Sequence, residues 1–119
     1  MGTDTIVAIS TPPGRSALSV VRSSGPSVRE IVVAVAGVLP PSRQAHYGQF
    51  AGRDGEAIDD GILLFFQGPR SFTGEDVAEF HIHGGPVVSQ LLFETMCALG
   101  ARPARPGEFS ERAFRNGKI

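Results

Sequence analysis

Short runs in which apolar residues dominate, or alternate with polar ones, predict five β-strands along the chain. These strands are expected over residues 4–9, 17–22, 46–52, 62–66 and 77–83. The run 62–66 is apolar throughout, which favours a central strand covered on both faces. A turn signal at Asp54-Gly55 precedes it, so we expect it to form an antiparallel hairpin with the strand 46–52.

Apolar residues at helical spacing, with recognisable start and stop signals, predict three helices. The first would run from Ser24 or Ser27, as its cap, to about Gly37. The second would begin at Pro86 and end before Gly100, and its apolar positions are Val88, Leu91, Leu92, Met96 and Leu99. The third would span residues 108–116, after an extended segment at 101–106. Strands and helices mix without a regular alternation, so the predicted fold class is α+β.

Composition narrows the picture to one small domain. The chain has 119 residues, of which 41% are hydrophobic, enough for a single buried core. A formal net charge of −1 provides no strong field for nucleic acid or an anionic membrane. Cys97 is the only cysteine, which excludes an intrachain disulfide and suggests a small core residue. We see no signal-peptide pattern and no apolar run long enough to span a bilayer, so we expect a soluble, cytoplasmic protein.

The most informative chemistry lies on the predicted strand 77–83. Its alternation creates an apolar face of Ala78, Phe80 and Ile82 and a polar face of Glu79, His81 and His83. The simplest interpretation of the polar face is a solvated surface of a half-buried sheet. A zinc site using His81 and His83 with His46 or Glu79 is a weaker alternative. A hydrolase using a histidine with Ser71 or Ser89 is weaker still, because no nucleophile-elbow motif is present.

Phosphate binding by the usual loop is excluded. The segment 68–74 contains neither the spacing nor the lysine of the G-x-x-x-x-G-K-[ST] motif, and Gly117-Lys118 is followed by Ile119. Gly84-Gly85 before a helix could offer N–H groups to an anion, although a tight turn explains it more simply. The scattered residues Arg22, Arg102, Arg105, Arg112 and Arg115 could pair with acids or bind carboxylates, and for each of them solvation at the surface is the default.

Several longer motifs, in order along essentially the whole chain, resemble the amino-terminal domain of the tRNA-modification GTPase family MnmE, also called TrmE. The motifs are DTIVA at 4–8, TPPG at 11–14, SFTGEDV at 71–77, HGGPVV at 83–88 and ARPGEFS at 104–110. Val21-Arg22 before Ser24-Gly25, and Asn116-Gly117-Lys118, extend the resemblance. The fold implied is a small, mixed, largely antiparallel sheet with two or three packed helices, of the folate-binding TrmE amino-terminal type.

The resemblance also implies a function. Members of the family use this domain to bind a tetrahydrofolate, such as 5-formyltetrahydrofolate, as the expected one-carbon donor. They also use it to form a homodimer, with the folate near the interface. Residues 1–119 would be one folate-binding and dimerisation domain, with Lys118 and Ile119 at the start of a helical domain. The GTPase domain, with its GTP, Mg²⁺ and K⁺, would lie outside this sequence.

In that family the whole protein acts with the flavin-dependent MnmG (GidA). Together they add a carboxymethylaminomethyl-type group at C5 of the wobble uridine of tRNA. Matched motif by motif, the family's folate contacts fall on Arg22, Glu79 and Lys118, and no catalytic residue or metal ligand is implied in this domain. A carboxylate such as that of Glu79 can accept both donors on the amino-pyrimidine edge of a pterin.

Two alternatives remain at this stage. The chain would be a purely structural dimerisation domain if the folate pocket were empty or incomplete, since the family's carboxy-terminal folate contact is absent here. It would be an unrelated small hydrolase if His81 or His83 served as a base. The resemblance gives no role to His81.

Overall fold

In the computed structural model, which describes residues 4–10, 18–83 and 85–119, the strands form a single six-stranded sheet. The strands are β1 (Thr5–Ser10), β2 (Ser19–Ser24), β3 (His46–Ala51), β4 (Ala57–Phe66), β5 (Val77–Ile82) and β6 (Ala101–Pro103). The helices are α1 (Val28–Ala36), α2 (Gly85–Ala98) and α3 (Glu108–Arg115).

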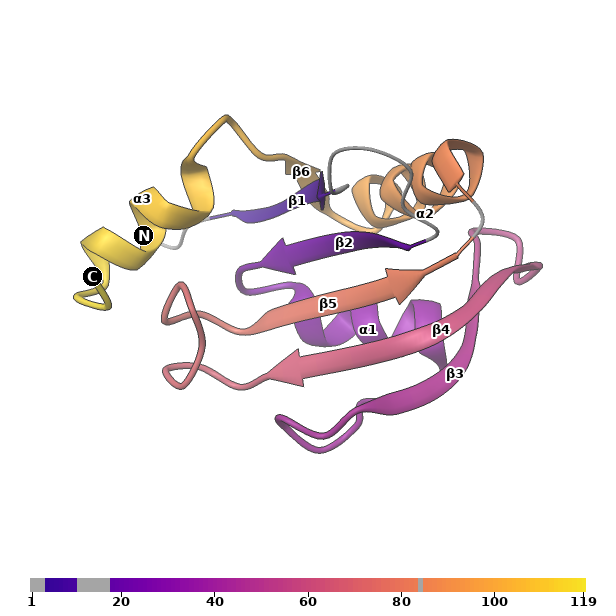
Figure 1. Cartoon of the computed structure of the whole chain (residues 1–119), viewed down its shortest axis with the longest axis horizontal. Coiled ribbons are helices and arrows are strands. Elements are labelled where there is room, and N and C mark those ends of the chain that lie inside the picture. Colours follow the sequence, from indigo (N-terminus) through magenta and orange to yellow (C-terminus); the bar gives the residue numbers. More distant parts are fainter. Residues whose placement is uncertain (1–3, 11–17, 84) are drawn as a thin grey trace.

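The order of the strands in the sheet is β3-β4-β5-β2-β1-β6 (Figure 1). All neighbours are antiparallel except β1 and β6, which run parallel. The predicted α+β class and the mixed, largely antiparallel sheet are therefore confirmed. Strand β6 occupies part of the segment 101–106, where the sequence predicted only extended chain.

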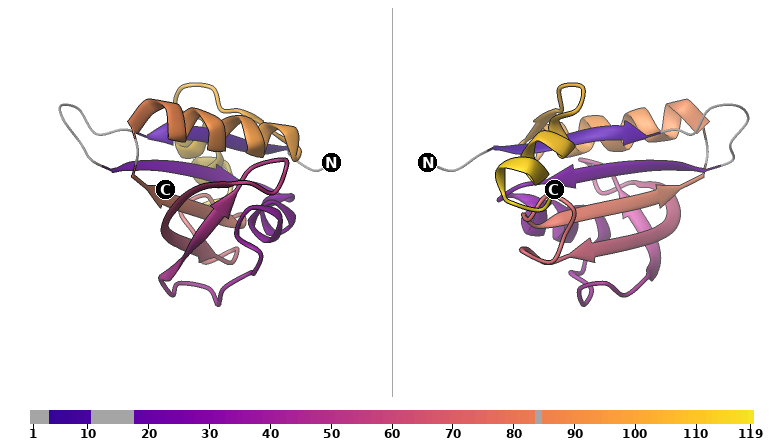
Figure 2. Two further views of the ribbon diagram at one scale, coloured as in Figure 1. Left: turned by 90° about the vertical axis from the view of Figure 1, so that its right-hand side faces the viewer. Right: turned by 60° about the vertical axis from the view of Figure 1, so that its left-hand side comes forward.

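Helices α1 and α2 cover one face of the sheet, and the core lies between them and the strands. Helix α1 packs on β3 and β5, whereas α2 lies along β1, β2 and β6 (Figure 2). Phe50 of β3 and Phe80 of β5 meet edge to face in this core, with ring centroids 5.1 Å apart. Full burial of such a side chain stabilises the fold by about 2 kcal/mol. The apolar face predicted for 77–83 is confirmed, because Phe80 and both of its apolar neighbours on that face are fully buried.

The opposite face of the sheet remains largely open, and this corrects one prediction. Strand β4 lies inside the sheet, but within the run 62–66 only Leu63 and Phe65 are buried, while Ile62, Leu64 and Phe66 are half-buried on the open face. The apolar run 62–66 therefore does not mark a strand covered on both faces. Its second face is available for a ligand or another chain.

Two local predictions for the helices also need correction. Leu91 and Leu99 of the predicted apolar stripe are exposed, and Thr95 is buried on α2 instead, where its hydroxyl donates to the Leu91 carbonyl. Ser27 lies at the start of α1 but makes no side-chain capping bond, and the Ser24 hydroxyl bonds to other elements. The stop at Gly37 is confirmed, because its φ of 79° is the left-handed conformation that glycine adopts easily.

Cys97 is half-buried and packs against the core, and burial raises the pKa of its thiol. The turn predicted at 11–14 and the glycine at 84 lie outside the described residues. No helix in the described parts of the chain combines the length and the apolar character needed to cross a bilayer.

Candidate functional site

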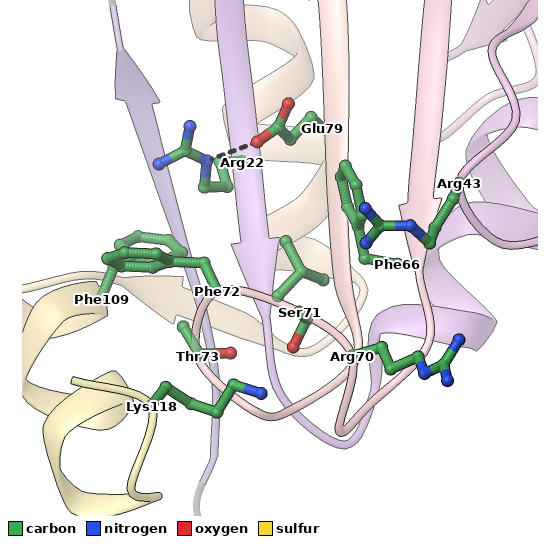
Figure 3. A pocket seen from close by; sticks show the side chains of 11 residues that line it. Arg22, Arg43, Phe66, Arg70, Ser71, Phe72, Thr73, Glu79, Phe109 and Lys118 are labelled. Atoms are coloured by element: carbon green, nitrogen blue, oxygen red, sulfur yellow. Dashed lines mark hydrogen bonds and ion pairs between the residues drawn. The ribbon is translucent and has the colours of Figure 1, made fainter.

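A cavity of about 360 Å³ opens on the uncovered face of the sheet, at the end where β4 runs into the loop 67–76 (Figure 3). Strands β2, β4 and β5, the loops around residues 43 and 67–76, helix α3 and the carboxy-terminal segment all contribute side chains. The cavity is lined by Arg22, Arg43, Phe66, Arg70, Ser71, Phe72, Thr73, Val77, Glu79, Phe109 and Lys118. The structure thus brings together all three residues that the family resemblance assigned to folate, Arg22, Glu79 and Lys118.

Arg22 and Glu79 lie directly opposite each other on the neighbouring strands β2 and β5. The Arg22 Nε donates to the Glu79 Oε2 over 3.1 Å, and the other oxygen, Oε1, lies 3.1 Å from the His81 Nε2. A carboxylate offers about four lone-pair sites, so these two contacts leave acceptor capacity toward the cavity. His81, to which the sequence gave no role, therefore helps to fix the orientation of Glu79.

Three aromatic rings give the cavity planar walls. Phe66 comes from the end of β4, Phe72 from the following loop and Phe109 from the first turn of α3. Phe72 is 50% exposed and lies at the cavity beside the other two rings. The Arg22 guanidinium carbon lies 5.8 Å from the centre of the Phe109 ring. Flat faces of this kind suit a planar, conjugated ligand.

The loop 67–76 holds its shape through its own hydrogen bonds. Gly68 N donates to the Asp76 carboxylate over 2.9 Å, and the Ser71 hydroxyl donates to the Glu75 carbonyl. Gly74, at a φ of 86°, lies so close to Asn116 that an added Cβ would come within 3.0 Å of the Asn116 Cβ. This wall of the cavity is therefore held by hydrogen bonds and packs against the carboxy-terminal segment.

Helix α3 is attached to the rest of the domain mainly through charge. Arg112 is only 2% exposed, and its guanidinium donates to Asp4, Glu75 and Glu108. The buried Glu108 also accepts two bonds from Arg102, and these bonds lower the pKa of Glu108 to about 2. The sequence predicted solvation at the surface as the default for the scattered arginines, and this prediction is wrong for Arg112. The network places Phe109 at the cavity.

The charges around the cavity differ from those of the whole chain. Lys118 lies at the α3 side of the cavity, where its Nζ donates to the Pro69 carbonyl over 2.9 Å. Four cationic side chains and one carboxylate line the cavity, which gives it a formal charge of +3, whereas the whole chain carries −1. A ligand with negative charge would therefore be favoured.

The alternative chemistries find less support in the geometry. Around the described residues no group of three or more histidine, cysteine or acidic side chains is arranged to hold a metal ion. His83 N donates to the Asp59 carboxylate, while His81 pairs with Glu79. The hydroxyls proposed as nucleophiles bond to backbone groups instead, Ser71 to Glu75 and Ser89 to the first turn of α2.

Sequence reasoning missed five residues that line the cavity with distinct chemistry, namely Arg43, Phe66, Arg70, Phe72 and Phe109. Phe72 was visible as a lone aromatic in a polar loop, which is a usable signal. Arg43 and Phe66 gave none, because their proximity depends on the turn after α1 meeting the end of β4.

The fold and the cavity define a small α+β domain suited to bind an anionic ligand with a planar portion. Residues 5–118 match the sequence family described as GTP-binding protein TrmE N-terminus, and the chain belongs to that family. It is 58% identical over 116 residues to a tRNA modification GTPase MnmE of Stutzerimonas stutzeri, and 56% identical to that of Chromohalobacter salexigens. Each alignment covers 98% of this chain.

The same kind of relative from Alkalilimnicola ehrlichii is 53% identical and aligns with the whole chain. The alignments cover only 26%, 25% and 27% of these three relatives, so the chain spans about a quarter of their length. It corresponds to the amino-terminal domain of such a GTPase.

Proposed function

We propose that this chain binds a reduced folate, such as 5-formyltetrahydrofolate, in the cavity between β2, β5 and α3. The observation that carries the proposal is the convergence of Glu79, Arg22 and Lys118 on one aromatic-walled, cationic cavity. The pterin edge would meet the free acceptor sites of Glu79, with Arg22 and Lys118 near ring carbonyls or carboxylates. The volume falls within the range of small-molecule pockets.

The second part of the proposal is a homodimer through this domain. The open face of the sheet carries a shallow hollow lined by Leu18, Tyr47, Ile62, Leu64 and His81, among others. Leu18 is 48% exposed and Tyr47 is 66% exposed, so a sizeable apolar surface faces outward. A two-fold contact on this face would bury it. The His81–Glu79 hydrogen bond would place the folate next to that contact.

The whole protein of which this domain would be part is proposed to be a cytoplasmic GTPase that acts with MnmG on the wobble uridine of tRNA. The folate held here would supply one carbon to that modification. GTP, Mg²⁺ and K⁺ would belong to a separate GTPase domain. This sequence lacks a phosphate-binding loop, which is consistent with nucleotide binding by a separate domain.

Calorimetric titration of the purified chain with 5-formyltetrahydrofolate tests the proposal directly. We expect saturable binding with one folate per chain and a rise in thermal stability with ligand concentration. If no heat is released and the melting temperature stays constant up to millimolar folate, the folate proposal fails. The structural alternative would then remain, provided that the chain still self-associates.

A further inference from the structure

The β4 side of the cavity carries two cations that the family contacts leave unexplained, Arg43 and Arg70. Both line the cavity and both are exposed (Figure 3). Within the part of the chain that the structure describes, neither guanidinium has a hydrogen-bonded or ion-paired partner. Arg22 and Lys118, by contrast, are engaged with Glu79 and with the Pro69 carbonyl. The two unpaired guanidiniums are thus the groups most available to an anion.

The backbone conformation and hydrogen bonds around Arg43 hold this residue in a defined position. Arg43 has a φ of 70°, a left-handed conformation that costs a residue with a Cβ about 1 kcal/mol. Its N–H donates to the Phe65 carbonyl over 2.8 Å, and the Ser42 hydroxyl accepts from Gln67 N over 2.9 Å. The turn is therefore tied to the end of β4 on both sides of Phe66. Its guanidinium carbon lies 5.7 Å from the centre of the Phe66 ring.

A strained backbone held by surrounding bonds is more typical of a binding position than of a solvated arginine. Arg70 lies in the turn that follows β4, where its N–H donates to the Gln67 carbonyl over 3.0 Å. Figure 3 shows both side chains on the opposite side of the cavity from Lys118. Two guanidiniums at the rim match two carboxylates, because each planar fork can donate two hydrogen bonds to one carboxylate.

We propose that Arg43 and Arg70 form a subsite for the glutamate tail of the folate, so that the cavity prefers folates with several linked glutamates. The inference rests on the proposed folate function. With the pterin at Glu79, the benzoyl ring would extend past Phe66 toward the rim. Each added glutamate brings one more carboxylate, and the first of these would reach the two arginines.

Three ligands separate the tail from the rest of the molecule: 5-formyltetrahydropteroate, which lacks glutamate, 5-formyltetrahydrofolate, and its triglutamate. We expect the triglutamate to bind about tenfold more tightly than the pteroate form in calorimetry at low salt, since each exposed pair contributes modestly. Added salt should narrow the difference by screening these contacts.

The double variant Arg43→Gly/Arg70→Gln should remove the preference, because it should weaken binding of the triglutamate much more than binding of the pteroate form, which carries a single carboxylate. Glycine tolerates the left-handed conformation, so the fold should persist, and a thermal melt checks this. Arg53→Gln is the matched control, because the exposed Arg53 precedes β4 at the other end of that strand. The control should keep the preference.

Equal affinities of the wild type for all three ligands would overturn the tail subsite while leaving the folate site intact. A preference that survives in the double variant would show that other residues hold the tail, and would also overturn the assignment. If none of the ligands bound, the proposed function itself would fail, and this inference with it.

Discussion

Glu79 is the one acidic residue among the described side chains that line the cavity. Its carboxylate is held by Arg22 on the neighbouring strand and by His81 two residues along its own strand. Two fixed partners restrict the rotamer without using all the acceptor sites. Such a group is oriented before the ligand arrives, which lowers the entropy cost of binding.

Glu79→Gln should weaken folate binding while altering the fold little. The amide replaces one acceptor oxygen by a donor, so one donor of the pterin would face another. Losing a charge-assisted hydrogen bond costs about 1.5–3 kcal/mol, or roughly tenfold to a hundredfold in affinity. Paired folate titration and thermal melting measure both effects. Glu56→Gln, at an exposed carboxylate on the β3–β4 turn, is the control. Unchanged affinity would remove Glu79 from the site, and a collapsed melting temperature without ligand would assign it a structural role.

At the scale of elements, helix α3 depends on ion pairs more than on apolar contact. Its buried residues are Glu108, Arg112 and Ala113. Arg112 forms ion pairs with Glu108, Asp4 and Glu75. The last two partners come from the opposite end of the sequence and from the loop 67–76. An ion pair buried in this way is costly to break, because the remaining charge loses its partner.

The stability of the docked α3 should therefore decline in acid. The folded-state pKa of Glu108 is about 2, below its reference value of 4.5, chiefly because Arg102 donates to it. A lowered pKa stabilises the fold fully above about pH 4.5, and this contribution is lost as the pH falls toward 2. Thermal melts between about pH 6 and about pH 2, a range that includes both the reference and the folded-state pKa of Glu108, would show the decline.

Glu108→Gln should lower stability by about 2 kcal/mol at neutral pH and flatten the acid dependence. Glu30→Gln, on the exposed side of α1, should leave both unchanged. A variant at 108 whose acid profile matched that of the wild type would show that other carboxylates control the transition.

The contrast between α3 and the strands explains which features of the structure could be predicted from the sequence. The alternation in β5 and the stop at Gly37 depend on nearby residues, and both were predicted correctly. The burial of Arg112 and the approach of Arg43 to Phe66 depend on segments brought together only by the fold. Such contacts between distant segments cannot be predicted from the periodicity of apolar residues. The assignment of Arg22, Glu79 and Lys118 to a folate site came from family motifs and stays a prediction.

At the scale of the whole molecule, the sheet is covered on one face and open on the other. Helices α1 and α2 protect the core, while the second face exposes apolar side chains next to the cavity. We expect a second copy of the chain to cover the open face, consistent with the proposed homodimer.

Tyr47→Lys should shift the chain from dimer to monomer. The lysine would introduce a charge at an exposed apolar position of the open face, and it would lie near Asp60, with which Tyr47 now bonds. The fold should thus be retained. Val33→Lys on the exposed side of α1 is the matched control and should remain dimeric. Sedimentation equilibrium at micromolar concentration would decide, and a wild type that is wholly monomeric would contradict the dimer itself.

The chain on its own should not hydrolyse GTP, because it lacks the backbone loop and lysine that hold the phosphates. Phosphate release measured with the purified chain and Mg²⁺ checks this. Activity that persisted through repeated purification would overturn the assignment of the chain to a domain without a nucleotide site.

The pairing of β1 with β6 has a consequence for the order in which the domain can fold. Strand β1 gains its second neighbour only from residues 101–103, and Asp4 gains its partner Arg112 later still. During synthesis the amino-terminal strand would therefore wait, with one edge exposed, until nearly the whole domain had left the ribosome. The wall of the cavity formed by α3 closes in the same final stage, so a nascent chain could not hold the proposed folate until translation has passed this region.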